Sequence, residues 1–230
     1  MSVGAVTLPS SSLQFWQTTV GKKAVMAVTG IVLFGFVIGH LMGNLQIYEG
    51  PERLNNYALL LKSHPGLLWF TRALLLVSVV VHIWASFQLW LLQREARPIG
   101  YRKKANLNSS YASRTMYWSG PIVLAFVIFH LLNFTFGTVH PHASFVVSDV
   151  YNNVVTGFQY WPVSGFYIIG MVLLCLHLYH GLWSIFYSLG FSHPRYTPWI
   201  QGIAKIVAIL IAAGYISIPV AVLLGFIRAV

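Results

Sequence analysis

The sequence predicts an all-α integral membrane protein, one domain of residues 1–230 in which five transmembrane helices form a bundle. The first observation is composition: of 230 residues, 57% are hydrophobic and 8% are charged, where soluble proteins average about a quarter charged. The second is that the apolar residues gather in five runs, each long enough to cross a hydrocarbon core about 30 Å thick. The third is that most Lys and Arg residues lie between these runs. The net charge of +10 therefore fits the charge bias of membrane proteins better than a nucleic-acid-binding surface.

The apolar runs are expected to be helices, because open strands would leave backbone groups unpaired in lipid. Residues 1–20 are polar and are expected on the membrane surface, and Lys22 and Lys23 introduce the first span. A short surface helix is expected from Asn55 to Lys62, in the connection to the second span. The expected spans are about 23–45, 66–92, 115–137, 162–190 and 201–227.

The connections between the spans predict the orientation of the chain. The loop 93–114 is strongly basic, whereas 138–161 holds one carboxylate, Asp149, and no Lys or Arg. Because Lys and Arg are enriched on the cytoplasmic side of membranes, the N-terminus is expected inside and the C-terminus outside. The one cysteine, Cys175, lies inside an apolar run, and no motif for covalent haem attachment is present.

Four consecutive spans each contain a histidine, and these histidines are the candidate functional residues. A titratable ring inside a membrane-length apolar run is costly, which makes it a functional-site hypothesis. With a rise of 1.5 Å per residue, His40 and His130 fall in the outer half of the membrane, and His82 and His177 fall in the inner half. The sequence thus predicts two levels, each with two histidines from different helices.

Two neutral imidazoles from facing helices are the axial ligands of a bis-histidine haem. The two levels therefore predict two stacked haems b, which transfer single electrons because neither iron keeps an open position. His180 lies one turn from His177, and the depth estimate alone leaves open which of the two is the ligand. Small residues near the ligands, such as Ser86 and Gly181, are expected to let a macrocycle approach the helices.

The carboxylates of two haems need cations or hydrogen bonds, because unpaired charge in lipid is expensive. Arg72 is the candidate near the outer level, and Lys23 and Arg114 are the candidates near the inner level. An equally good interpretation is that all three anchor helix ends at the membrane surface. Asn44 and Asn133 follow the outer histidines and either bind these carboxylates or cap the helix ends.

Several motifs resemble the five-helix cytochrome b558 subunit of succinate dehydrogenases and fumarate reductases. The resemblance covers about 20–228, and its most specific part is the fourth span. The matching stretches are Phe166-Tyr167-Ile168, Leu176-His177-Leu178-Tyr179-His180-Gly181-Leu182-Trp183-Ser184, Thr29-Gly30, His40-Leu41-x-Gly43-Asn44, Ser113-Arg114 through Gly120, and His130.

The resemblance implies which histidines bind together. In that family the ligands come from spans one and three and from spans two and four, so His40 would pair with His130 and His82 with His177. The family's ligand in span four precedes a Gly-Leu pair by four residues, which selects His177 over His180.

The resemblance also implies the function of a membrane-anchor subunit of succinate:quinone oxidoreductase (complex II) in the bacterial cytoplasmic membrane. Such a subunit relays electrons between an iron–sulfur subunit and membrane quinone, menaquinone or ubiquinone. It has no catalytic residue for succinate, because a separate flavoprotein subunit holds that site. We expect the basic loop 93–114 and the N-terminal segment to dock the iron–sulfur subunit. A higher oligomer of the complex is left open.

The quinone site is the part of the molecule that the sequence defines least. Glu52 lies in the outer loop before the second span, and Asp149 and Tyr151 lie in the second outer loop. Each is a candidate for quinone binding or proton transfer, although an ordinary surface residue is the better interpretation of each. Two other functions also fit: a di-haem cytochrome of a nitrate reductase or hydrogenase, and a haem-free transporter in which the histidines relay protons.

Overall fold

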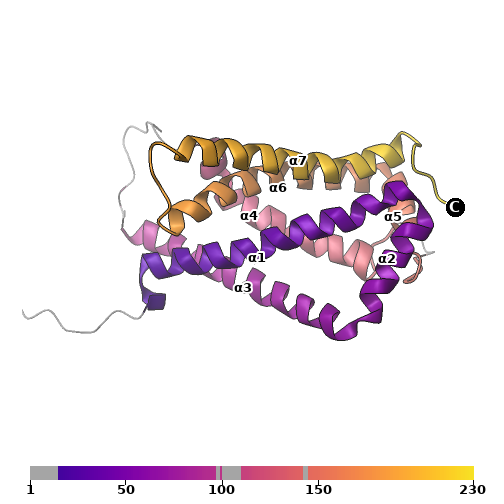
Figure 1. Ribbon diagram of the computed structural model, residues 1–230, viewed down its shortest axis with the longest axis horizontal. Helices are drawn as coiled ribbons and strands as arrows, with labels where there is room; N and C mark the ends of the chain where they lie inside the picture. The colour runs from indigo at the N-terminus through magenta and orange to yellow at the C-terminus, as the bar shows by residue number, and fades with distance from the viewer. Residues whose placement is uncertain (1–14, 97–98, 100–109, 142–144) are drawn as a thin grey trace, which may run out of the picture.

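The computed structural model describes residues 15–96, 99, 110–141 and 145–230 (Figure 1). Of the segment 1–20 that is expected on the membrane surface, residues 1–14 fall outside the described residues, as does most of the basic loop 93–114. Within the described residues all regular elements are helical. In chain order they are η1 (Phe15–Gln17), α1 (Thr19–Leu45), η2 (Gln46–Glu49), α2 (Pro51–Ser63), α3 (Pro65–Glu95), α4 (Tyr111–His130), η3 (Leu131–Thr135), α5 (Val150–Gln159), α6 (Trp161–Ser188) and α7 (Thr197–Leu223).

Five of these helices are long and apolar enough to cross a membrane, which confirms the predicted fold class. They are α1 with η2, α3, α4 with η3, α6 and α7, and each covers most of one expected span. The chain is thus an all-α, multi-pass membrane protein. The first connection also contains a short helix, α2, over the residues for which one was predicted.

Side chains and prolines mark where the long helices begin. Thr18 accepts a hydrogen bond from the backbone N–H of Gly21, 2.9 Å away, and so caps α1. Ser110 accepts in the same way from Ser113 at the start of α4. Proline occupies the first turn of α3, α6 and α7, where its missing N–H costs no helical hydrogen bond.

One connection differs from the loop expected over 138–161. Residues 150–159 form helix α5, and its N-cap is the side chain of Asp149, which accepts from the N–H of Asn152. The buried side chains Tyr151, Val154, Val155 and Phe158 recur at helical spacing and stabilise this helix by packing against the bundle. With only ten residues, α5 is too short to cross a membrane, so the hydropathy pattern that predicts the spans does not predict this helix.

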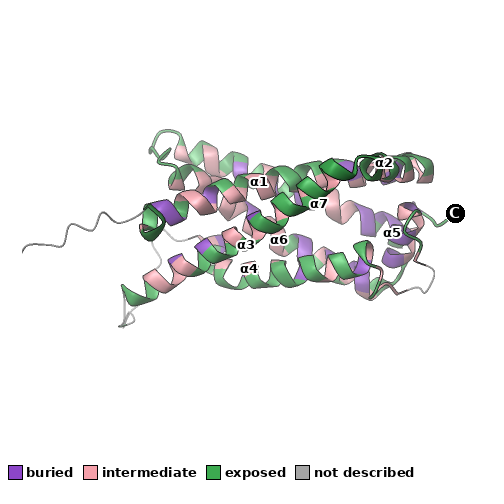
Figure 2. Cartoon of the chain, turned by 90° about the horizontal axis from the view of Figure 1, so that it is seen from below, coloured by how far each residue is buried: buried purple, intermediate pink, exposed green. Residues whose placement is uncertain are grey.

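Helices α2 and α5 lie against each other at one end of the bundle, which we call the capped end (Figure 1). The opposite end, the loop end, is where α1, α4 and α7 begin and α3 and α6 finish. The largest cluster of buried apolar residues belongs to the capped end and includes Ile47, Leu54, Val155 and Ile227. Figure 2 likewise shows buried residues gathered around α5.

The long helices differ in how much they pack against one another. Helix α1 packs on α3, α6 and α7, and α6 packs on α4 and α7. In their most apolar stretches α6 and α7 bury 33% and 39% of their residues, whereas α3 and α4 bury 17% and 11%. Helix α1 also buries 17%, so within the part of the chain that the structure describes the sides of α1, α3 and α4 are less covered by protein than those of α6 and α7.

Candidate functional site

Two pairs of histidine rings meet inside the bundle, one pair at each of two levels. Near the capped end, the rings of His40 on α1 and His130 on α4 lie with centres 5.7 Å apart and planes at 84°. Each ring of this capped-end pair is stacked on a phenylalanine one turn earlier on its own helix, His40 on Phe36 and His130 on Phe126. Those stacking contacts limit the rotation of both rings.

The second pair, which we call the loop-end pair, joins α3 and α6. The ring centres of His82 and His177 are 6.5 Å apart. The neighbouring His180 lies instead against Trp183 on its own helix, 5.1 Å away. The structure therefore brings His177, and not His180, to His82, although spacing along the sequence did not distinguish them.

The two pairs lie at different depths along the bundle. The hydroxyl of Thr29 on α1 is 3.1 Å from the ring of His82, and His40 follows Thr29 by eleven residues. At 1.5 Å per residue, the two levels are about 16 Å apart. The depth estimate from sequence grouped the same four histidines in the same two pairs.

Each pair spans helices whose backbones are not packed together. The close backbone contacts among the described helices join α1 to α3 and α6, and α4 to α6, but make no substantial link from α1 to α4 or from α3 to α6. The rings thus reach across the bundle from helices held apart, which is the arrangement needed to grip a group placed between them.

Hydrogen bonds fix which nitrogen of His82 is available. Its Nδ1 lies 3.1 Å from the backbone carbonyl of Met26 and 3.1 Å from the hydroxyl of Thr29. A carbonyl only accepts, and the Thr29 hydroxyl itself donates to Val25, so Nδ1 carries the proton. Nε2 is then left as a neutral lone-pair donor, the form in which an imidazole binds a metal.

The donor set fits a haem. A metal that binds two rings from opposite sides separates their centres by about 6 Å, given metal–nitrogen bonds of about 2 Å, and the two pairs have 5.7 and 6.5 Å. Two imidazoles complete the coordination of an iron already held by a porphyrin. In addition, a Cβ added at Gly39 or Gly181 would meet no atom within 4 Å, so the helices leave open space beside His40 and one turn after His177.

Comparison with known proteins identifies no relative. No family model, curated protein or solved structure matches this chain. The functional assignment therefore depends on the two histidine pairs and on the resemblance of the sequence motifs to the cytochrome b558 subunit.

The predicted cations have different surroundings. Arg72 is exposed, and its guanidinium lies over the ring of Trp69, 5.0 Å from the ring centre. Arg114 is exposed in the first turn of α4. Lys23 is exposed as well, whereas its neighbour Lys22 is only 8% exposed.

Sequence reasoning missed Lys22 as a candidate, although a signal was present. Lys22 precedes His40 by eighteen residues and Thr29 by seven, which are about five and two helical turns. It therefore lies on the face of α1 that carries both of those residues, two turns beyond the contact with His82. Counting back from His40 in turns of 3.6 residues would have selected Lys22 over Lys23.

Other predicted residues of the haem surroundings serve their own helices or lie beside the pairs. The amide of Asn44 donates to the carbonyl of His40, 2.7 Å away, and so satisfies a carbonyl near the end of α1. Ser86 is exposed one turn after His82, and Gly181 is half-buried one turn after His177. Asn133, by contrast, is fully buried and contacts the hydroxyl of Tyr167.

The three quinone candidates lie at the capped end. Glu52 is exposed in the first turn of α2. Tyr151 is buried, and its hydroxyl donates to the carbonyl of Arg228. Partial burial alone would raise the pKa of Asp149, but hydrogen bonds from Asn152 and Asn55 outweigh it and hold the pKa below its ordinary value. Asp149 and Tyr151 thus connect α5 to its neighbours, and their role toward quinone stays a prediction.

Proposed function

We propose that this chain is the di-haem cytochrome b anchor of a succinate:quinone oxidoreductase, relaying electrons between an iron–sulfur subunit and membrane quinone. The observation that carries the proposal is the pair of histidine contacts at two levels, drawn from four membrane-length helices. The sequence resemblance adds the succinate-linked complex. A single intramembrane histidine would favour a helix–helix hydrogen bond, but four histidines in two facing pairs favour axial ligation.

In this proposal His40 and His130 hold one haem b, and His82 and His177 hold the other. Each haem held by two of these histidines would supply one-electron transfer. The chain's own contribution is to fix the ligands. The Met26 carbonyl and Thr29 orient His82, and Phe36 and Phe126 limit the rotation of the capped-end rings.

The same proposal places the loop end at the cytoplasmic surface. Basic residues of the described chain at that end include Lys22, Lys23, Arg94 and Arg195, which fits the positive-inside rule. The iron–sulfur subunit would dock there, with electrons passing to or from the loop-end pair first. Lys103 and Lys104 of the basic loop, which we expect to contribute to docking, lie outside the described residues.

The decisive measurement is a pyridine haemochrome assay on the purified complex, expressed as haems per copy of this chain. We expect a value near two in the wild-type protein and near one after His82→Ala. The variant Cys175→Ser, on α6 two residues before His177 but without a ligand role, is the matched control and should keep both haems. A wild-type protein without a Soret band would end the proposal and favour the proton-relay transporter.

A second measurement separates this function from those of other di-haem cytochromes. Co-purification with a succinate-oxidising flavoprotein supports the succinate-linked complex. Co-purification with a nitrate reductase or a hydrogenase instead would be consistent with the two haem sites and would contradict the assignment to a succinate-linked complex.

A further inference from the structure

A buried tyrosine lies beside one member of the capped-end pair. The hydroxyl oxygen of Tyr167, on α6, is 3.2 Å from Nδ1 of His130. On its other side the amide of Asn133 is 3.4 Å from the same oxygen. Tyr167 is 6% exposed and Asn133 is not exposed at all, so water does not replace these contacts.

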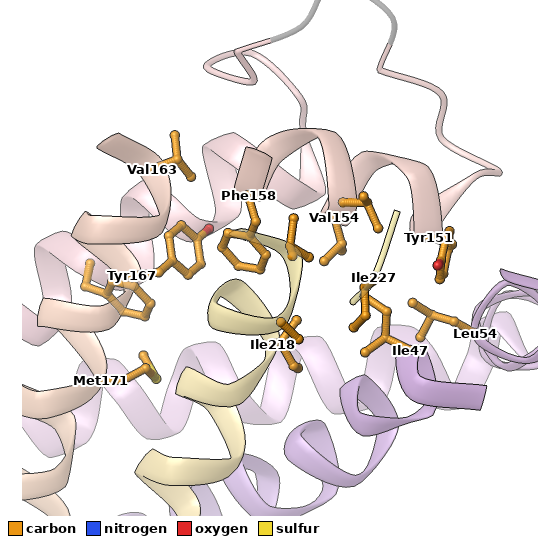
Figure 3. Packing of buried hydrophobic residues seen from close by; sticks show 14 residues of the cluster. Ile47, Leu54, Tyr151, Val154, Phe158, Val163, Tyr167, Met171, Ile218 and Ile227 are labelled. Atoms are coloured by element: carbon orange, nitrogen blue, oxygen red, sulfur yellow. The ribbon is translucent and has the colours of Figure 1, made fainter. Parts of the chain in front are cut away.

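The packing around Tyr167 leaves its hydroxyl little freedom. Its ring meets those of Phe126, Phe134 and Phe158, with centres 5.2, 5.4 and 5.0 Å away. Figure 3 shows Tyr167 beside Phe158, both within the cluster of buried apolar residues. A side chain held on several faces by aromatic rings keeps its polar atom in one place.

The backbone widens from an α-helix to a π-helical turn at the end of α4, in the segment that contains Asn133. Directly after His130 the chain continues as the π-helical segment η3, in which the N–H of Phe136 donates to the carbonyl of Leu131. Such widened turns occur often at functional sites. Here the widened turn contains the fully buried Asn133, which points its amide at Tyr167.

The direction of the hydrogen bonds follows from the chemistry of a ligand. A histidine that binds a metal through Nε2 carries its remaining proton on Nδ1, and it almost always donates that proton to an acceptor. For His130 the available acceptor is the Tyr167 oxygen. The hydroxyl of Tyr167 then needs an acceptor of its own. Asn133 provides one, because a half-turn of its amide presents Oδ1, which otherwise has no partner among the described residues.

We infer that Tyr167 is the positioning residue of His130: its oxygen accepts a hydrogen bond from Nδ1 of His130, and its hydroxyl donates a hydrogen bond to Oδ1 of Asn133. The inference rests on the proposed function, since it assigns His130 as a haem ligand. A ligand whose N–H is accepted by a fixed oxygen is more basic and stabilises the oxidised iron. Tyr167 therefore keeps the potential of the capped-end haem lower than it would otherwise be.

The test is a spectroelectrochemical redox titration of the purified complex with wild-type protein and Tyr167→Phe. The variant should retain two haems per chain, and one of the two midpoint potentials should rise while the other stays unchanged. Asn133→Leu should raise the same potential by a smaller amount, because Tyr167 then loses its acceptor. Tyr215→Phe is the matched control. The ring centre of Tyr215 is 6.2 Å from that of His40, but its hydroxyl donates to the carbonyl of Val37 and not to a histidine. Both midpoint potentials should therefore stay at the wild-type values.

The outcomes are distinguishable. Two haems with both potentials unchanged in Tyr167→Phe, or a potential that falls, would overturn the role of Tyr167 and leave the proposed function standing. If Tyr167→Phe fails to hold two haems, Asn133→Leu decides: a rise in one potential supports the inference and no change rejects it. A wild-type protein without two haems would overturn both the inference and the proposed function.

Discussion

At the scale of single residues, a backbone carbonyl orients one histidine of the loop-end pair. The carbonyl of Met26 accepts a hydrogen bond from Nδ1 of His82, which leaves the lone pair of the ring on Nε2. Gly30 lies alongside, where an added Cβ would stand 3.5 Å from Cε1 of that ring. The Thr29-Gly30 stretch that contributes to the sequence resemblance thus lies directly against one imidazole.

The contrast between His177 and His180 gives a prediction about ligand identity. Only His177 lies against His82, while His180 lies against Trp183. We expect His177→Ala to remove one of the two low-spin haem signals in electron paramagnetic resonance spectra and His180→Ala to keep both. The reverse result would assign the ligand to His180 and contradict the pairing of His82 with His177.

The adjacent lysines give a prediction about the haem carboxylates. Lys22 is buried on the face of α1 that carries Thr29 and His40, and Lys23 is exposed. The one ion pair between described side chains is Arg53 with Glu49, so no carboxylate of this chain is seen to balance Lys22. Loss of a charged hydrogen bond costs about 1.5 kcal/mol or more. Lys22→Met should therefore weaken retention of the loop-end haem about tenfold.

The measurement for this pair of lysines is haem content during extended washing in detergent. Lys23→Met, which removes an equal charge one position along the chain, serves as the control and should retain haem as the wild type does. Equal losses from both variants would mean that net charge, and not the position of Lys22, matters.

At the scale of elements, the capped end depends on one carboxylate. Asp149 accepts hydrogen bonds from the N–H and amide of Asn152 and from the amide of Asn55. It thereby caps α5 and joins it to α2. These bonds hold the pKa of Asp149 below its ordinary value. Its ionised form therefore stabilises the fold fully at every pH above that ordinary value, near pH 4. The contribution is lost as pH falls through the lower, folded-state pKa.

Replacing this cap should loosen α5 without disturbing the histidine pairs. An N-cap is worth about 1 kcal/mol, so Asp149→Ala should speed hydrogen exchange of 150–159 about fivefold at pH 7. Asp149→Asn keeps a capping side chain that does not titrate, so its exchange should be close to wild type at pH 7 and lack the acid-dependent rise. An unchanged exchange rate in Asp149→Ala would show that apolar burial alone holds α5.

Hydropathy predicted the long helices and their approximate ends, because twenty apolar residues have few alternatives in a membrane. Helix depth also grouped the four histidines, since the rise per residue of a straight helix is constant. The sequence did not reveal α5, whose Val and Asn residues carry little helical preference and depend on packing. It also did not reveal the contact between Tyr167 and His130, because rotation of α6 against α4 is set by side-chain packing that no single-helix pattern encodes.

At the scale of the whole molecule, the distribution of charge predicts the orientation. Cys175 is the one cysteine of the chain, so Cys175→Ser provides a cysteine-free background. In that background we expect Ser63→Cys, exposed at the end of α2, to react with a membrane-impermeant maleimide in intact cells. Ser192→Cys, exposed between α6 and α7, should react only after lysis. Labelling in the opposite order would invert the topology and place the partner subunits at the capped end.

The histidine contacts between helices that do not pack together have a consequence for biosynthesis. Each contact closes a loop of roughly ninety residues, so under the proposed function it would act on the chain as a cross-link does when iron is bound. A nascent chain cannot complete the first of these closures before α4 has left the ribosome, nor the second before α6 has followed. Cofactor delivery would then be a late event that locks an already inserted polypeptide, and starvation for haem should leave an anchor that is present in the membrane but easily degraded.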